Sequence, residues 1–329
     1  MPKHSIVIPA CNRFDYLWHT VVSCLASSET DLELLINDDA SNHESADMFY
    51  DKVKSLDPRV KVLRNNQNEG VGTRLFELHA VAQGEFIHVL GSDDLMHPKR
   101  LEVASDEIYR SSSKQVIWCS SAVFLDASYR KVGVSSSNIT SSFIKASLFL
   151  QPHIMHPTVS YYHPEISCHQ PYRVGMRAAV DYMYYIDNYT TTPIHVCPFP
   201  LTYLVHSSSG ITRTGISRSL QLSMHDYAMH RLWSKYVPCT MSQISIMRTI
   251  LVTGEYPTQD VTKLSACDYE HLLSLVEALN KVAEESLNNP EDIIAVAQGK
   301  SIKHSECDDL MGLTRIMKYK LNQSIRNAF

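Results

Sequence analysis

The first 125 residues alternate short apolar runs with segments of helical periodicity. Each apolar run is nearly continuous, which is typical of a strand that is covered on both faces. Strand–helix alternation of this kind predicts right-handed crossovers and a mostly parallel sheet. The predicted strands are 5–9, 32–36, 60–63, 85–90 and 116–125. The predicted helices are 15–26, capped by Asp15, and 45–55, 72–83 and 98–109, the last with Pro98 in its first turn.

The pattern becomes less regular after residue 126 and helical after residue 217. Residues 135–142 are rich in serine, threonine and asparagine, which predicts a loop. Further strands are predicted at 157–162 and 200–206, and a helix at 177–189. Helices are predicted downstream at 217–236, 241–253, 268–288, 291–298 and 309–327. We therefore predict a first domain over 1–214, made of the halves 1–110 and 111–214, and a helical region over 215–329.

Composition narrows the possible classes of protein. The chain is 44% hydrophobic and carries a formal net charge of −5, so it lacks the basic footprint of a nucleic-acid-binding protein. No run approaches the ~20 apolar residues of a membrane span, and the N-terminus does not resemble a signal peptide. The eight cysteines form no metal-binding spacing. We expect reduced cysteines and a cytoplasmic protein whose membrane contact, if any, is peripheral.

Polar and acidic residues follow the predicted strands. Asp38 and Asp39 come after the second strand, and Asp93 and Asp94 after the fourth. Ligands of such sheets bind beyond the carboxyl ends of the strands. A strand-end aspartate can also form a turn or cap a helix, so a structural role stays open for either pair alone. Two acidic pairs at one edge favour a binding site.

Four segments in order, SIVIPACNR, LELLINDDAS, NEGVGTR and AQGEFIHVLGSDD, resemble the inverting glycosyltransferases of family 2. The resemblance covers about the first 110 residues and continues weakly to about 206. It implies an α/β protein of the GT-A fold, with a Rossmann-like sheet flanked by helices and a helical C-terminal appendage. The half 1–110 would then bind the nucleotide, and the half 111–214 would face the acceptor. The implied enzyme is a hexosyl- or N-acetylhexosaminyl-transferase that moves a sugar from a nucleotide-diphosphate donor, expected to be a UDP-sugar, to a hydroxyl of a glycan or another acceptor, as in polysaccharide biosynthesis.

The resemblance also implies roles for the donor-binding residues. Adjacent strand residues point to opposite faces, so only one of Asp38 and Asp39 can face the nucleotide. Asp39 is expected to accept a hydrogen bond from the base, while Asp38 orients the loop. Arg74 lies near the position of a nucleotide-contacting arginine, where it would meet the diphosphate; the alternative is a solvated arginine on a helix face. Backbone contacts to the base are expected from Pro9, Ala10 and Asn12.

A divalent cation is implied at the second acidic pair. Asp94 is expected to bind Mn²⁺ or Mg²⁺, and Asp93 to reach the ribose or the metal. His206, at the end of a predicted strand, is a further candidate ligand; a structural role is the alternative. Many relatives have another acid at the position that Gly91 occupies here. That departure leaves open a catalytically degenerate scaffold.

The implied catalytic base is Asp181, within RAAVDYMYYID. A sugar hydroxyl is a weak nucleophile, and a carboxylate can take its proton as it attacks the anomeric carbon. Asp187 is the competing candidate. A nucleotidyltransferase of related fold is the other alternative, but the glycine-rich phosphate loop expected for it is absent after the first strand.

The region 215–329 is expected to pack on the first domain or on a second copy of the chain. Its predicted first helix mixes apolar and charged residues, which indicates an amphipathic face that needs a partner. Four basic residues near the C-terminus favour contact with anionic lipid as the alternative. They are Arg315, Lys318, Lys320 and Arg326.

Overall fold

The computed structural model describes residues 1–42, 44–135, 141–149, 151–166, 171–188, 192–206, 215–235, 237–248, 271–278 and 318. The chain divides into two compact units. Unit 1 comprises Met1–Ile139 and Ile154–Leu220, and unit 2 comprises Thr140–His153 and Gln221–Phe329. The domain boundary at 214 and the halves of the first domain stay predictions. The predicted helices 291–298 and, apart from Lys318, 309–327 lie outside the described residues.

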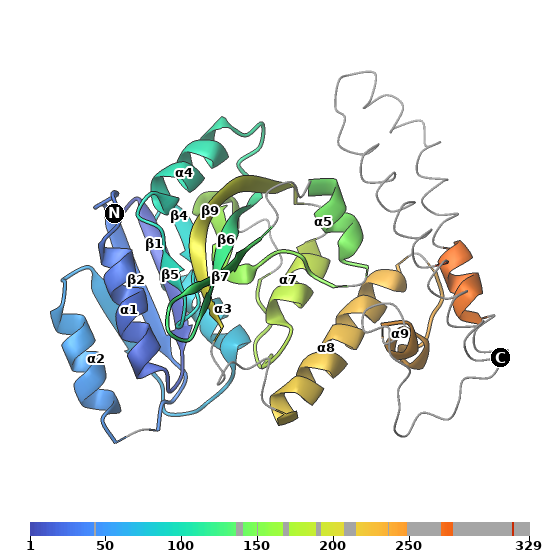
Figure 1. Cartoon of the computed structure of the whole chain (residues 1–329), viewed down its shortest axis with the longest axis horizontal. Helices are drawn as coiled ribbons and strands as arrows, with labels where there is room; N and C mark the ends of the chain where they lie inside the picture. The colour runs from blue at the N-terminus through green and yellow to red at the C-terminus, as the bar shows by residue number, and fades with distance from the viewer. Residues whose placement is uncertain are drawn as a thin grey trace. The chain divides into compact units, whose positions relative to one another are not determined.

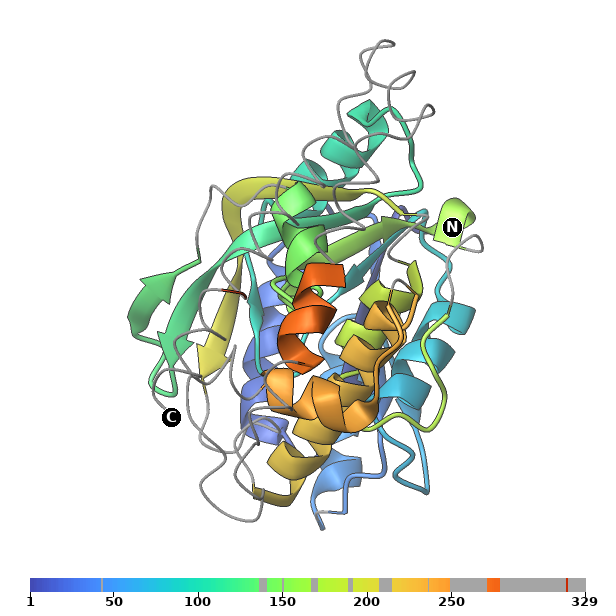
Figure 2. The same ribbon diagram turned by 90° about the vertical axis from the view of Figure 1, so that its right-hand side faces the viewer.

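Unit 1 is built on a nine-stranded sheet in the order β3-β2-β1-β4-β8-β6-β9-β5, with β7 paired to β6 (Figure 1). Strands β3, β2, β1 and β4 are parallel, and β8 enters antiparallel between β4 and β6. Figure 2 shows the long β9 running beside β6, to which it is parallel. The strands are β1 (His4–Ala10), β2 (Leu32–Asp38), β3 (Val60–Arg64), β4 (Phe86–Val89), β5 (Leu95–Met96), β6 (Ile117–Asp126), β7 (Lys131–Val134), β8 (Val159–Tyr162) and β9 (Ile194–His206).

Helices fill the connections of this sheet. In unit 1 they are α1 (Phe14–Leu25), α2 (Ala46–Ser55), α3 (Val71–Val81), α4 (Arg100–Arg110), α6 (His163–Ile166) and α7 (Val180–Asn188). A short 3₁₀ helix, η1 (His156–Thr158), precedes β8. Ile6 and Ile8 of β1 join a core with α1 and α2. Asn37 of β2 donates to the backbone oxygen of Arg74, which places α3 on the opposite face of β2 from Ile36.

The elements predicted for the first 125 residues are confirmed, with small shifts at their ends. Asp15 lies in the first turn of α1, whose N-cap is Arg13, so the predicted Asp15 cap is wrong. Pro98 precedes α4 rather than occupying its first turn. The strand predicted at 200–206 begins at Ile194. Pro198 and Pro200 interrupt the strand pattern in the first half of β9, so the sequence did not predict that half. The β6–β9 register shifts at the same place.

Unit 2 contains α5 (Ser141–Ser147), most of α8 (Gly215–Trp233), α9 (Met241–Arg248) and a helix over 271–278. The Trp233 ring packs edge-on against Phe149, and its indole N–H donates to the Phe149 carbonyl at 2.8 Å. Arg248 and Asp226 form a buried ion pair. No described helix is both long and apolar enough to span a bilayer. Binding of the region 215–329 to a second copy of the chain or to lipid stays a prediction. Of its four basic residues near the C-terminus, Arg315, Lys320 and Arg326 lie outside the described residues.

Two buried histidines link three strands of unit 1. His4 Nδ1 lies 3.0 Å from His88 Nε2, and His88 Nδ1 lies 2.8 Å from the Ser160 hydroxyl. Burial lowers the pKa of His4 to about 4 and lowers the pKa of His88 as well. Both rings are therefore neutral in the folded chain at neutral pH.

We expect the free energy of unfolding to fall as the pH drops from 6.5 to 4. The unfolded chain takes up protons on these histidines across that window and the folded chain does not, at up to about 1.4 kcal/mol per pH unit for each ring. Urea unfolding at several pH values measures the slope. His88→Gln should make it shallower, whereas the exposed His19→Gln should not. An unchanged slope in His88→Gln would contradict the assignment.

Candidate functional site

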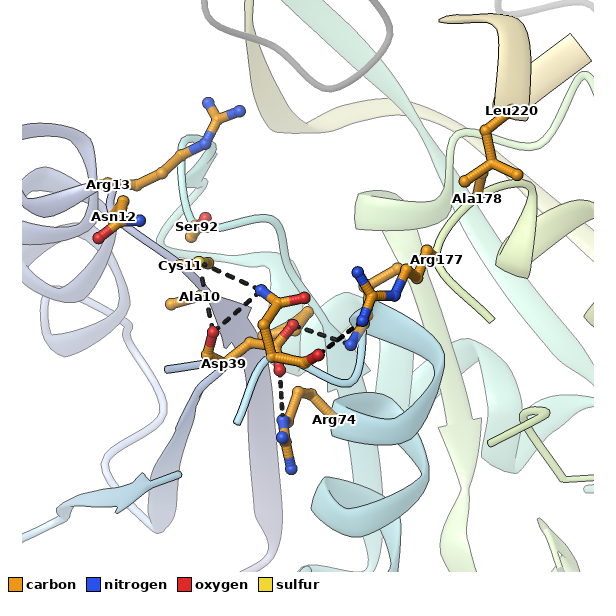
Figure 3. A pocket seen from close by; sticks show the side chains of 14 residues that line it. Ala10, Cys11, Asn12, Arg13, Asp39, Arg74, Ser92, Arg177, Ala178 and Leu220 are labelled. Carbon is orange, nitrogen blue, oxygen red and sulfur yellow. Dashed lines mark hydrogen bonds and ion pairs between the residues drawn. The ribbon is translucent and has the colours of Figure 1, made fainter. Parts of the chain in front are cut away.

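The loops after β1 and β2 and the start of α3 surround a cavity of about 540 Å³ in unit 1 (Figure 3). This position is the carboxyl edge of the parallel strands, where ligands of such sheets bind. Five of the residues predicted to bind the nucleotide line the cavity: Pro9, Ala10, Asn12, Asp39 and Arg74. The other lining residues are Cys11, Arg13, Asn68, Gly70, Val71, Ser92, Arg177, Ala178 and Leu220.

Asp39 is fixed by three N–H donors. Its carboxylate accepts from the backbone N–H of Glu69 at 2.9 Å, from that of Gly70 at 3.0 Å and from Arg74 Nε at 2.8 Å. A carboxylate offers about four lone-pair positions, so one remains for a ligand. Asn68 adds to this arrangement by donating to the backbone oxygen of Asp39. The cavity therefore presents a positioned hydrogen-bond acceptor.

Asp38 points away from that cavity, as the alternation of strand residues predicts. Its buried carboxylate accepts from the Tyr50 hydroxyl and from Arg64 Nε, both at 2.8 Å. It also accepts from the backbone N–H and the hydroxyl of Ser41 in the following loop. Ser41 in turn accepts from the backbone N–H of Asn12. Asp38 thus ties the loop after β2 to the loop after β1.

Arg74 is buried, with 2% of its side chain exposed. It pairs with Asp39 and Glu77, both at 2.8 Å, and lies 3.4 Å from Glu69. Arg74 is therefore not a solvated arginine on a helix face, which was the alternative interpretation of the sequence. Because these carboxylates already compensate its charge, the contacts support a role in positioning Asp39.

The second acidic pair lies at the end of β4. Asp94 Oδ1 accepts from the backbone N–H of Val205 on β9 at 3.1 Å, and Asp93 pairs with Arg13. Burial and the neighbouring Asp93 charge raise the pKa of Asp94 to about 8. Burial also raises the pKa of Asp93. A cation bound beside these two adjacent carboxyl groups would favour their ionised forms by compensating the negative charge.

Gly91 leaves the space that the Asp94 carboxylate occupies. A Cβ at residue 91 would lie 2.3 Å from Asp94 Oδ2 and 3.2 Å from Asp94 Cγ. Any side chain at position 91 must therefore displace the Asp94 carboxylate. The observed Asp94 conformation thus depends on the absence of a side chain at position 91.

Asp93 and Asp94 supply the hard oxygen ligands that Mg²⁺ and Mn²⁺ accept together with phosphate oxygens, so the residues present fit such an ion. Among the described residues, no three acidic, histidine or cysteine side chains gather as a ligand group. His206 is exposed and its ring lies 5.3 Å from that of Phe124. The structure therefore does not bring His206 into one ligand group with Asp93 and Asp94.

We expect Asp94→Asn to stabilise the metal-free chain at alkaline pH. The raised pKa of Asp94 makes the folded chain lose stability relative to the unfolded chain as the pH rises from about 4 to 8, and asparagine removes that loss. The gain should be about 1–3 kcal/mol larger at pH 8 than at pH 5. Urea unfolding in EDTA measures it, with the half-exposed Asp106→Asn as the control. An equal effect at both pH values would rule out the buried charge as its cause.

Asp181 and Asp187, the two candidate bases, lie in different surroundings on α7. Asp181 is half-buried in the first turn. Asp187 is held in a two-pronged ion pair by Arg173, with Nε–Oδ2 at 2.7 Å and Nη2–Oδ1 at 2.9 Å. Both carboxylate oxygens of Asp187 are thus engaged by one guanidinium. The contacts favour Asp181 as the available base.

Three residues beside the site adopt left-handed backbone conformations that non-glycine residues rarely take. They are Asn12 at φ 51°, Ala40 at φ 56° and Ala179 at φ 50°. Asn12 lines the cavity, Ala40 follows Asp39, and Ala179 precedes Asp181 by two residues. Strained backbone of this kind is common at functional sites, where the surrounding structure fixes it.

The sequence prediction missed four polar residues of the cavity. They are Arg13, Asn68, Ser92 and Arg177. Arg13 follows a predicted contact residue and Asn68 lies in a predicted loop, so proximity in sequence was a usable signal for both. Arg177 comes from a segment more than a hundred residues away, and no local pattern marks it.

Comparison with known proteins places residues 5–168 in the sequence model described as glycosyl transferase family 2. The chain is 30% identical to the chondroitin synthase of Escherichia coli over 118 residues, which is 36% of this chain and 17% of that protein. It is 31% identical to the UDP-Glc:alpha-D-GlcNAc-diphosphoundecaprenol beta-1,3-glucosyltransferase WfaP of Escherichia coli over 134 residues, 40% of this chain and 51% of that one. The chain thus spans about half or less of the length of these relatives.

The fold resembles solved structures over nearly its whole length. TarS 1-349 of S. aureus in complex with UDP-GlcNAc matches with a TM-score of 0.56 at 15% identity, covering 98% of this chain and 92% of TarS. The same fragment in complex with UDP matches with a TM-score of 0.55 at 16% identity and the same coverage. At such low identity the likeness concerns the fold. It confirms the predicted GT-A fold.

Proposed function

The chain belongs to glycosyl transferase family 2 through residues 5–168, and on that premise we propose that it moves a sugar from a UDP-linked donor to a hydroxyl group of a glycan. The main support for a UDP-linked donor is the Asp39 carboxylate, which three N–H donors position at the cavity. A carboxylate accepts the N3–H of uracil and repels a ring nitrogen that is itself an acceptor. The structurally similar TarS fragment binds UDP and UDP-GlcNAc, which supports the same choice.

Asp93 and Asp94 are the residues that would hold a divalent cation beside the donor diphosphate. A bound Mg²⁺ or Mn²⁺ would neutralise the charge that develops on the departing diphosphate. Asp94 is oriented by the N–H of Val205 and by the space that Gly91 leaves. Arg13 holds Asp93 and lines the cavity, so it links the acidic pair to the donor site.

Asp181 is proposed as the general base, with inversion at the anomeric carbon. It would take the proton of the acceptor hydroxyl as the oxygen attacks, so that the carbon–oxygen bond to the diphosphate breaks in the same step. This single displacement needs no covalent sugar–enzyme intermediate. The engagement of Asp187 by Arg173 supports the choice between the two acids.

A glycan acceptor is supported by the relatives, whose names describe chondroitin synthesis and glucosyl transfer to a lipid-linked N-acetylglucosamine. The five cysteines among the described residues are free thiols: Cys11, Cys24, Cys119, Cys197 and Cys239. Free thiols support the proposal that the chain works in the reducing cytoplasm.

Titration calorimetry with UDP, in Mn²⁺ and in EDTA, tests the donor and the metal together. We expect tighter UDP binding in Mn²⁺, and we expect Asp94→Ala to remove the difference between the two buffers. Asp39→Ala should weaken uridine binding in EDTA by about tenfold, because the base loses a hydrogen bond to a charged group. Equal UDP affinity in both buffers would exclude the metal. Unchanged uridine affinity in Asp39→Ala would place the base elsewhere.

A further inference from the structure

Three arginines line the cavity, and their partners differ. Arg13 pairs with Asp93, and Arg74 pairs with Asp39 and Glu77. Arg177 is exposed and donates from Nη2 to the backbone oxygen of Asn68 at 2.7 Å. A carbonyl oxygen does not neutralise a guanidinium, which carries five N–H donors. Arg177 therefore brings charge and further donors to the cavity.

The turn 68–70 connects Arg177 to Asp39 (Figure 3). Asn68 accepts from Arg177 through its carbonyl and donates through its side chain to the Asp39 backbone oxygen at 3.1 Å. Gly70 donates its N–H to the Asp39 carboxylate. A Cβ at Gly70 would lie 2.6 Å from Arg177 Cγ, so the arginine stem lies against that glycine. Asp39 and Arg177 therefore both form hydrogen bonds with the turn 68–70.

The backbone that carries Arg177 is anchored on the start of α3. Gly72 donates its N–H to the Met176 carbonyl at 3.0 Å, and Gly175 donates to the Thr73 hydroxyl at 2.9 Å. A side chain at Gly72 would meet the carbonyl oxygens of Arg173 and Met176. These contacts fix the position of residue 177 relative to Asp39. The arginine is a positioned group and does not belong to a free loop.

We propose that Arg177 recognises the nucleobase by donating to the O4 carbonyl oxygen of uracil. The inference rests on the proposed function, in which Asp39 accepts the N3–H. In uracil, that N–H is flanked by two carbonyl acceptors, so a carboxylate and a guanidinium side by side match its edge. Cytosine keeps the carbonyl at C2, but its N3 acceptor opposes the Asp39 carboxylate and its C4 amino group opposes a guanidinium at the O4 position. Arg177 thereby adds to the preference for uracil over cytosine.

Titration calorimetry in EDTA with uridine, UDP and CDP tests this role. We expect Arg177→Ala to weaken uridine and UDP binding by the same factor, about tenfold, as for a hydrogen bond to a charged group. The ratio of UDP to CDP affinity should fall, and Arg177→Lys should restore part of the loss. Arg110→Ala, which removes an exposed arginine outside the cavity, should leave all three affinities unchanged.

Several results would overturn the proposal. A loss for UDP without a loss for uridine makes Arg177 a diphosphate contact. A lower melting temperature of the ligand-free Arg177→Ala chain, with the UDP-to-CDP ratio unchanged, makes it a structural residue. If Arg177→Ala binds uridine and UDP as tightly as the wild type does, this inference is overturned but the proposed donor class is not. A wild-type chain that binds neither uridine nor UDP overturns the proposed donor class, and this inference with it.

Discussion

Asp181→Asn should lower turnover by about 10²–10⁴-fold while leaving donor affinity unchanged, the usual contribution of a general base. Asparagine keeps the size of the side chain and removes its ability to take a proton. Asp181 does not line the donor cavity, so UDP binding should survive the change. Steady-state kinetics with a UDP-sugar, together with calorimetric titration of UDP, separates the two effects.

Asp187→Asn is the matched control. It breaks the two-pronged pair with Arg173, so it should lower the free energy of unfolding and leave the chemical step largely intact. An inactive, well-folded Asp187→Asn beside a nearly normal Asp181→Asn would move the base to Asp187. NMR of the product formed from an α-linked donor should show a β-linkage. An α-linked product would rule out single displacement.

The sequence predicted the part of the site that depends on strand ends. Asp39 and Asp94 follow buried strands, and parallel strands bring their carboxyl ends to one edge. The alternation of strand residues predicted that Asp38 and Asp39 point to opposite faces. In the structure Asp38 accepts a hydrogen bond from Tyr50, and Asp39 accepts one from Arg74. Rules with a fixed period were sufficient for these positions.

Positions that depend on tertiary packing were beyond those rules. The partners of Arg74 follow from the folding of the turn 68–70 against β2, and helix periodicity cannot show which carboxylates it meets. The fit of Gly91 to Asp94 depends on side-chain conformation. Arg177 reaches the cavity only because 173–178 docks on α3, a contact between distant segments. His206 ends its strand as predicted, but the sequence did not show that its ring packs against Phe124.

Arg74→Met should lower the free energy of unfolding by about 3 kcal/mol, because it leaves the buried Asp39 carboxylate without its charged partner. Glu69 and Glu77 are partly exposed, so water can replace the arginine for them and the cost stays near the lower end of the range for a broken buried pair. Urea unfolding measures the change, and the exposed Arg110→Met is the control.

The double variant Arg74→Met/Asp39→Asn separates positioning from packing. If the loss in Arg74→Met comes from an uncompensated Asp39 charge, neutralising Asp39 should recover part of it, with a coupling energy of about 1–3 kcal/mol. The two substitutions should instead be additive if Arg74 acts only by filling space. Uridine affinity distinguishes the same alternatives: a loosened Asp39 should bind the base more weakly in Arg74→Met, whereas an unchanged affinity would show that Glu69 and Gly70 alone hold the carboxylate in place.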